Sequence, residues 1–213
     1  MESIKSTIST DAGQEKELFS NALSNKIPKL KMNKSNMRIG LFGIGLHEYW
    51  AQFEGLEQRL IGYLEDVSAA ISAIHPQVVN LGLIDSSEKA FEAGHKFRQE
   101  DVDIIFLFVS TYALSSTVLP VVQRAKVPVI ILNLSPEAAI DYASFNAMTD
   151  RTRMTGEWLA YCQSCSVPEI ASVFKRTGIE FHQITGMLYN DDRCWNEVKE
   201  WIEAAKVVDV MSH

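Results

Sequence analysis

The sequence predicts an α/β protein built on a doubly wound, five-stranded parallel sheet. A length of 213 residues accommodates one compact α/β domain. From Met37 onward, short runs of apolar and β-branched residues alternate with amphipathic stretches, the pattern of strands connected by helices. The runs are apolar at nearly every position, as in strands that are buried on both faces. We therefore expect a three-layer sandwich with helices on both sides of the sheet.

Residues 1–36 differ in composition from the rest of the chain. They are rich in Ser, Asn and Lys and show almost no apolar periodicity. We expect a flexible amino-terminal extension over residues 1–36, with a short helix near residues 16–23, followed by one folded domain over residues 37–213. Four lysines clustered in the extension could contact an acidic partner, but a solvated linker is the favoured interpretation.

Five apolar runs are expected to form the strands. In chain order they are Arg38–Phe42, Val78–Ile84, Asp103–Val109, Val127–Leu132 and Ile179–Thr185. The first helix is the best defined, because apolar residues recur every three or four positions from Phe53 to Ile74 and form one stripe. The last helix places Trp195, Val198, Ile202 and Ala205 on one face.

Capping residues predict where other helices begin and end. Asp85-Ser-Ser-Glu88 matches a capping box after the second strand. Ser135-Pro136-Glu137 combines a cap, a first-turn proline and an acid favoured by the helix dipole. Gly178 is expected to end the helix before the fifth strand.

Five βα units in succession favour a flavodoxin-like strand order of 2-1-3-4-5. Ligands of such sheets bind beyond the carboxyl ends of the strands, near the switch between strands one and three. The loops expected there are residues 43–50, 110–114 and 133–137.

The charge balance excludes some classes of partner. The chain has 20 Lys and Arg against 27 Asp and Glu, a net charge of −7, and no basic stripe for nucleic acid. No apolar run is long enough to cross a membrane, and the amino terminus does not resemble a secretory signal. Three cysteines suit a reducing compartment. We therefore expect a cytoplasmic protein without nucleic-acid or membrane partners.

Familiar catalytic motifs are incomplete. Gly43-Ile-Gly45 resembles the start of a dinucleotide-binding loop, but Glu48 stands where the third glycine belongs, and its charge would repel a phosphate. An oxidoreductase using FMN or a nicotinamide cofactor is therefore a minor hypothesis. The sequence contains no hydrolase nucleophile elbow, Walker loop or His-Glu-x-x-His helix.

Cys162-Gln-Ser-Cys165 has the spacing of a redox pair. Reactive pairs lie at helix amino ends, where the dipole stabilises a thiolate, whereas this motif follows a helical segment and is expected to end that helix. Inert thiols are the favoured interpretation. A zinc site would need two further ligands, for which Cys194 and His182 are the candidates.

The loop after the first strand contains His47, Glu48, Tyr49 and Trp50. Hydrogen-bonding groups beside aromatic rings suit a polyhydroxylated ligand, because its hydroxyls need polar partners and its apolar faces stack on rings. Alternatively, Tyr49 and Trp50 only cover the end of the sheet. Both interpretations remain open at this point.

Four passages resemble the amino-terminal part of the L-arabinose isomerase and L-fucose isomerase superfamily, most closely an arabinose-isomerase-like branch. They are RIGLFGIGLHEYW at Arg38–Trp50, VNLGLID at Val79–Asp85, TYALSSTVLP at Thr111–Pro120 and MTGEWLAY at Met154–Tyr161. The resemblance covers nearly all of residues 37–213. It implies a metal-dependent aldose–ketose isomerase that uses Mn2+ and assembles from three-domain subunits.

In that family the metal ligands and acid–base residues lie in later domains. The resemblance therefore implies that this chain is an amino-terminal domain, inactive when isolated, that contributes one wall of a sugar site and homo-oligomer contacts. The residues implied to bind a pentose or hexose are Leu46, His47, Glu48, Tyr49 and Ser135. Leu46 and Glu48 replace a Gln and a Leu of the family, so the sugar need not be arabinose. The alternative is a stand-alone module that binds a sugar or a subunit without catalysis.

Overall fold

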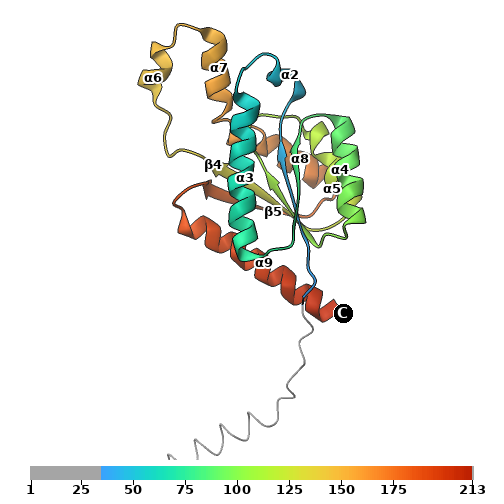
Figure 1. Ribbon diagram of the computed structural model, residues 1–213. Helices are drawn as coiled ribbons and strands as arrows, with labels where there is room; N and C mark the ends of the chain where they lie inside the picture. Colours follow the sequence, from blue (N-terminus) through green and yellow to red (C-terminus); the bar gives the residue numbers. More distant parts are fainter. Residues whose placement is uncertain (1–34, 213) are drawn as a thin grey trace, which may run out of the picture. The chain divides into compact units, whose positions relative to one another are not determined.

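A parallel sheet of five strands forms the centre of the protein (Figure 1). The structure is a computed structural model that describes residues 35–212. Its strands are β1 (Ile39–Ile44), β2 (Val78–Ile84), β3 (Ile104–Phe108), β4 (Val129–Ser135) and β5 (Phe181–Met187). Their order is β2-β1-β3-β4-β5, which confirms the predicted fold class. The helix expected near residues 16–23 lies outside the described residues.

Burial along the strands follows their place in the sheet. Every residue of β1 and β3 is buried, because these strands have a neighbour on each side and helices on both faces. Strands β2 and β5 lie at the two edges and are only partly buried. The strand boundaries differ from the predicted ones by up to three residues.

Helices cover both faces of the sheet (Figure 1). The helices described are α2 (His47–Trp50), α3 (Leu56–Ile74), α4 (Ser87–Gln99), α5 (Leu119–Ala125), α6 (Tyr142–Ala147), α7 (Arg151–Leu159), α8 (Val167–Thr177) and α9 (Asp192–Ser212). Helices α3 and α9 pack on one face, and α4, α5 and α8 pack on the other. Helices α6 and α7 extend beyond the end of the sheet at which β1 terminates.

Each face has its own apolar core. On one face the stripe of α3, including Leu64, Val67 and Ile71, packs with Val198 and Ile202 of α9. On the other, the buried side chains come from α4 (Ala90, Ala93, Phe97), α5 (Val121, Val122) and α8 (Ile170, Phe174). Burying a large apolar side chain contributes about 1.5–3 kcal/mol, so these layers provide the main driving force for the fold.

Two of the predicted helix starts are wrong. Ser86, not Asp85, caps α4, since its hydroxyl accepts a hydrogen bond from the Lys89 N–H; the Asp85 carboxylate is bound elsewhere. No helix begins after Ser135, which is the last residue of β4. The next helix, α6, is capped by Asp141. By contrast, Gly178 ends α8 in the left-handed conformation, with φ of 69°, as expected.

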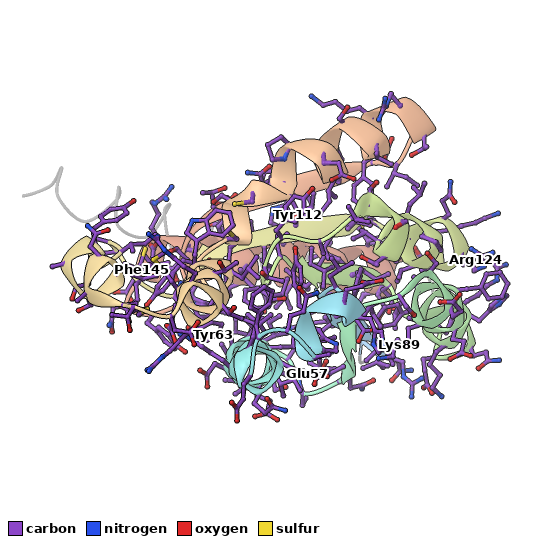
Figure 2. The ribbon with its side chains drawn as sticks, turned by 90° about the horizontal axis from the view of Figure 1, so that it is seen from above. Glu57, Tyr63, Lys89, Tyr112, Arg124 and Phe145 are labelled. Carbon is purple, nitrogen blue, oxygen red and sulfur yellow. The ribbon has the colours of Figure 1, made fainter. Side chains whose placement is uncertain are left out.

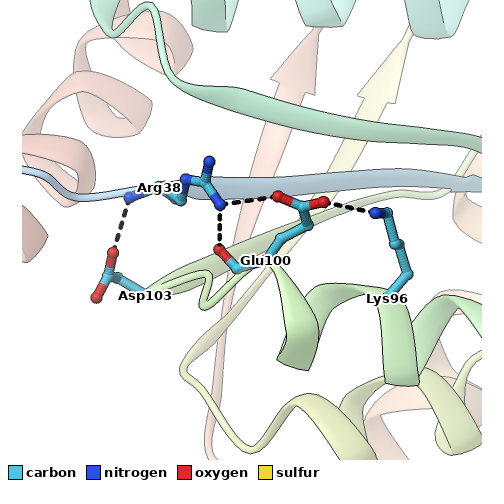
Figure 3. Close-up of polar contacts among 4 residues, drawn as sticks. All are labelled: Arg38, Lys96, Glu100 and Asp103. Carbon is cyan, nitrogen blue, oxygen red and sulfur yellow. Dashed lines mark hydrogen bonds and ion pairs between the residues drawn. The ribbon is translucent and has the colours of Figure 1, made fainter.

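Polar contacts fix the start of β1 against its neighbours (Figure 3). The Arg38 backbone N–H donates to Asp103 Oδ2 at 2.7 Å. The Arg38 guanidinium donates to the carbonyl and carboxylate of Glu100, which also accepts from Lys96. These contacts hold the end of α4 and the start of β3 beside β1. Because these contacts face solvent, they contribute little to the free energy of unfolding and mainly position the three elements.

Candidate functional site

The carboxyl ends of the parallel strands lie at one end of the molecule, which Figure 2 shows from above. In this view Tyr63 and Phe145 lie on the side of α6 and α7, whereas Lys89 and Arg124 lie on the side of α4 and α5. Residues 136–165, which follow β4, add α6 and α7 at this end before α8 returns the chain to β5. A ligand site is expected at this end.

The loop after β1 is held by Trp50. A Cβ atom at Gly45 would lie 2.7 Å from the Trp50 ring, so only glycine allows the ring to pack so closely on the backbone. The indole Nε1 donates to Asp85 Oδ2 at 2.8 Å. Lys89 forms an ion pair with the same carboxylate. The one-turn helix α2 is thereby attached to the end of β2.

Tyr49 lies in an aromatic cluster. Its ring makes edge contacts with Trp50 and Phe53 at centroid distances of 6.5 and 5.7 Å. Burial, followed by the proximity of Tyr112 and of the side chains of Cys162 and Cys165, raises the pKa of the Tyr49 hydroxyl. That hydroxyl therefore stays protonated at neutral pH and can donate a hydrogen bond.

The five predicted binding residues do not form one visible cluster. Leu46 and Tyr49 are half-buried, whereas His47 and Glu48 are exposed. Within residues 35–212, no hydrogen bond, ion pair or ring contact joins Ser135 to this loop, and its hydroxyl donates to the Glu137 carbonyl instead. Strand β3 separates β1 from β4. The assignment of these residues to a ligand stays a prediction.

A cavity of about 520 Å³ opens between the start of α3 and helix α7. It is lined by residues 52–56, by Arg59 and, from the α7 segment, by Asp150, Thr152, Arg153, Gly156 and Glu157. Gly156 allows α7 to approach, since a Cβ there would lie 3.2 Å from Phe53 Cβ. One lining residue, Leu56, also packs with Leu60, Leu159 and Ala160 in a small apolar cluster. The lining thus combines charged side chains with the apolar surface of Phe53 and Leu56.

Arg59 is held in this cavity by three acceptors. Its Nε donates to Tyr63 Oη at 2.8 Å, its Nη1 to Glu157 Oε2 at 2.7 Å, and its Nη2 to Tyr161 Oη at 3.2 Å. The guanidinium also lies 5.2 Å from the centre of the Tyr161 ring, within cation–π range. Burial opposes the charge, but the hydrogen bonds to Tyr63 and Glu157 outweigh it and raise the pKa of Arg59.

Asp150 and Arg153 complete the polar wall. The Asp150 carboxylate caps α7 by accepting from the N–H groups of Thr152 and Arg153. Arg153 lies four residues before Glu157, so both line the same face of α7. The Arg153 side chain makes no ion pair or hydrogen bond with any other residue that the structure describes. It is therefore free to bind a ligand.

Sequence patterns did not identify Arg59 or Glu157 as site residues. These two residues are 98 positions apart. Arg59 belongs to no motif, and Glu157 lies in the Met154–Tyr161 passage, for which the resemblance implied no site residue. The one local signal was the spacing of Arg59 and Tyr63, which places them on one helix face, but such pairs are common on exposed helices.

Between α7 and α8, Cys162 directly precedes a 3-10 turn, Gln163–Cys165, and Cys165 ends it. The expectation that they end a helix was thus incomplete, because α8 begins two residues after Cys165. Burial and a hydrogen bond with Cys165 raise the pKa of the Cys162 thiol well above its usual value. No cluster of three or more metal-ligating side chains occurs among residues 35–212, so Cys194 and His182 do not complete a zinc site with this pair.

Gly43 has a packing role. A Cβ atom at this position would lie 2.7 Å from the Leu83 side chain and 3.3 Å from that of Leu64. The glycine therefore admits apolar side chains rather than a phosphate.

In the part of the chain that the structure describes, no helix is long and apolar enough to cross a membrane.

Comparisons with known proteins place this chain in no family. No family model matches it, and no curated protein does. Among solved structures, the chain is similar to a Bacteroides fragilis protein provisionally named an acylhydrolase, with 12% sequence identity and a TM-score of 0.39 over 97% of this chain and all of the other. Likeness at that level transfers no activity.

These comparisons overturn the sugar-isomerase assignment. No family model and no curated protein matches the chain, so neither sequence comparison supports an isomerase. The isomerase activity, the role as an isomerase domain and the alternative of a non-catalytic sugar or subunit module are therefore withdrawn. The expectations of Mn2+, a pentose or hexose, and a homo-oligomer came from that resemblance alone and stay untested.

The side chains give no independent support for hydrolase chemistry. A serine hydrolase needs a serine hydroxyl beside a histidine base. Within residues 35–212, no serine is hydrogen-bonded to a histidine; His75 contacts the Met37 carbonyl and His182 contacts Glu197. Ser110 donates to the Ile44 carbonyl in the buried interior.

Proposed function

We propose that this protein binds a small metabolite carrying a carboxylate beside a hydroxyl or ammonium group, in the cavity between α3 and α7. The observation that carries the proposal is the arrangement of Arg59, whose guanidinium is held by three acceptors and lines a cavity. A positioned guanidinium is the protein group best suited to a planar carboxylate.

Arg59 retains donors for a ligand. A guanidinium has five N–H groups, and Tyr63, Glu157 and Tyr161 accept one each. Two N–H groups are therefore left without a partner among residues 35–212. Arg153 adds a second guanidinium to the same cavity. Because Arg59 is already ordered, less side-chain entropy is lost when a ligand binds.

The acids of the cavity indicate what else the ligand carries. Glu157 pairs with Arg59, and Asp150 caps α7. Glu54 lines the cavity, and its carboxylate has no partner among the residues described. An anion without a hydrogen-bond donor would be repelled by Glu54. A ligand with a carboxylate and a neighbouring hydroxyl or ammonium group can instead bind the guanidinium groups through its carboxylate and donate to Glu54. Amino acids and hydroxy acids have this chemistry.

The cavity size agrees with such a ligand. Its volume of about 520 Å³ lies within the usual range of roughly 300–1,000 Å³ for small-molecule sites. Phe53 and Leu56 contribute apolar surface to the lining, which can accommodate a short carbon skeleton.

Isothermal titration calorimetry with a small panel tests the proposal. The panel contains an amino acid, serine; a hydroxy acid, glycerate; the neutral polyol glycerol; and inorganic phosphate. We expect serine or glycerate to bind and glycerol not to bind. Arg153→Gln should weaken binding by at least tenfold, because the loss of a charge-assisted hydrogen bond costs roughly 1.5–3 kcal/mol.

Arg176→Gln is the matched control, since Arg176 is exposed in the last turn of α8 and far along the chain from the cavity lining. It should leave binding unchanged. Binding that Arg153→Gln and Arg176→Gln affect equally would place the ligand elsewhere. Equal binding of glycerol would show that the guanidinium groups do not select the ligand. Absence of binding by serine and glycerate alike would overturn the proposal.

A further inference from the structure

The turn that contains Cys162 and Cys165 is fixed to the carboxyl end of the sheet. The buried Gln163 amide donates to the carbonyls of Ser110 and Ala160 at 3.0 and 2.7 Å. Next along the chain, the Ser164 hydroxyl donates to Asn133 Oδ1 at 3.0 Å. Ser166 is held in turn by Ala113 and Thr111. The backbone between the cysteines therefore has little freedom to separate them.

The two cysteines are one helical turn apart. The Cys165 N–H donates to the Cys162 carbonyl at 3.2 Å, which closes one turn of chain and brings the two side chains to the same side. After burial, Cys165 is the group that raises the pKa of the Cys162 thiol, in keeping with two neighbouring side chains. A rotation about the side-chain bonds is then enough to bring the sulfur atoms to bonding distance.

The two thiols differ in access to solvent. Cys162 is 1% exposed, whereas Cys165 is exposed. A small disulfide can reach Cys165, and Cys162 can be reached only from within the turn. An accessible thiol beside a sheltered one is the arrangement needed for a two-step exchange.

We propose that Cys162 and Cys165 form a reversible intramolecular disulfide by exchange with a small-molecule disulfide such as oxidised glutathione. The Cys165 thiolate attacks one sulfur of oxidised glutathione, so a Cys165–glutathione bond forms, the glutathione disulfide breaks and one glutathione thiolate leaves. The Cys162 thiolate then attacks Cys165 Sγ, which forms the Cys162–Cys165 bond and expels the second glutathione. Two electrons pass to glutathione, and the two thiol protons are taken up by the leaving thiolates.

The second step is the slow one. Burial, the largest cause, raises the pKa of the Cys162 thiol and still acts once Cys165 carries glutathione, so little of this thiol is ionised at neutral pH. The rate of ring closure should increase about tenfold for each pH unit in this range, because the thiolate is the attacking species. The mixed disulfide at Cys165 should therefore accumulate at neutral pH and convert as the pH rises.

Cys194 provides an internal reference. It is buried in α9, in the core on the α3 side of the sheet, and its burial raises the pKa of its thiol to about 11. Nothing in the fold places it beside the other two cysteines. It should remain a thiol under conditions that oxidise the pair.

The test uses the full chain, reduced and then incubated with oxidised glutathione at several pH values. The samples are acid-quenched, unfolded and alkylated, and the intact mass and the peptides are measured. We expect the alkylated cysteines to fall from three to one, with Cys194 still alkylated and full recovery after reduction with dithiothreitol. In Cys162→Ser, glutathione should remain on Cys165. Cys194→Ser, the matched control, should form the disulfide as the native chain does.

The native chain alone can overturn the proposal, whatever the folding of the variants. Three alkylated cysteines after oxidation would do so, as would glutathione that stays on Cys165 at alkaline pH without ring closure. A disulfide that includes Cys194 would also contradict it. Intramolecular closure that slows rather than accelerates as the pH rises would overturn the proposed order of steps.

Discussion

The indole of Trp50 donates a 2.8 Å hydrogen bond to the carboxylate of Asp85, and this contact joins the loop after β1 to the end of β2. Asp85 is 3% exposed, so protein groups and not water stabilise its negative charge. Trp50 and Lys89 are those partners. The buried carboxylate of Asp85 therefore holds the loop after β1, which lies at the end of the sheet where a ligand is expected.

Trp50→Phe should destabilise the fold. The substitution keeps an aromatic ring but leaves a buried carboxylate with one donor fewer, which costs about 1.5–3 kcal/mol for a bond to a charged group. Urea denaturation measures the free energy of unfolding. Trp158→Phe is the matched control, since Trp158 is 48% exposed, and its effect should stay within about 0.5 kcal/mol. Equal losses for the two variants would contradict an anchoring role for Trp50.

Asp85 should also contribute to stability in a pH-dependent way. Burial favours protonation, but hydrogen bonds from Lys89 and Trp50 outweigh it and hold the pKa of Asp85 below its usual value. The folded state therefore binds this proton less readily than the unfolded state. The contribution is present above the unfolded pKa of about 4 and is lost as the pH falls through the folded pKa.

Urea unfolding of Asp85→Asn between about pH 6 and pH 3 tests this linkage. The native free energy of unfolding should fall more steeply with acidification than that of the variant. Asp101→Asn is the control, because Asp101 is exposed and its positive φ of 52° suits asparagine. A variant with the same acid dependence as the native chain would show that Asp85 is not an important acid-sensitive group.

The sheet was predictable from sequence because its strands are nearly continuous apolar runs that alternate with amphipathic stretches. Both patterns are set by residues that are close together in the chain. The first helix was predictable because its apolar residues recur every three or four positions, although α3 begins at Leu56 and not at Phe53. Ser135 was misassigned because a Ser-Pro-acid sequence suits both a helix start and a bend. Here β4 continues to Ser135 through pairing with β5, a contact that no local pattern reveals.

The site was less predictable than the fold. Arg59 and Glu157 meet because α7 packs on α3 through Leu60 and Leu159, a tertiary contact between segments that are distant in sequence. The role of Asp85 was missed for a similar reason, since its partner Trp50 precedes it by 35 residues. Sequence pattern located the end of the sheet but could not say which side chains converge there.

Gly94→Ala should destabilise the contact between α4 and α5. A Cβ atom there would lie 2.8 Å from the Pro120 carbonyl oxygen and 2.9 Å from that of Val121, and backbone cannot move aside as a side chain can. We expect a loss of about 1–3 kcal/mol from overpacking. Gly62→Ala in α3 is the control, because nothing lies within 4 Å of its added methyl.

Gly62→Ala should instead stabilise the protein by about 0.5–1 kcal/mol, since alanine favours a helix interior more than glycine does. Thermal unfolding followed by circular dichroism compares the two variants directly. A stabilising effect of Gly94→Ala would mean that α4 and α5 are not in close backbone contact.

Ser166→Ala should destabilise the turn that holds the cysteine pair. The Ser166 hydroxyl is buried; it accepts from the Ala113 N–H at 2.7 Å and donates to the Thr111 carbonyl. Alanine leaves both backbone groups without a partner, and an unsatisfied buried group costs about 1–3 kcal/mol. Ser172→Ala, at an exposed position of the same helix, should be neutral or slightly stabilising because of the helix propensity of alanine. Urea denaturation of both variants measures the difference, and a Ser166→Ala loss no larger than that of Ser172→Ala would show that this hydroxyl does not secure the turn to the loop after β3.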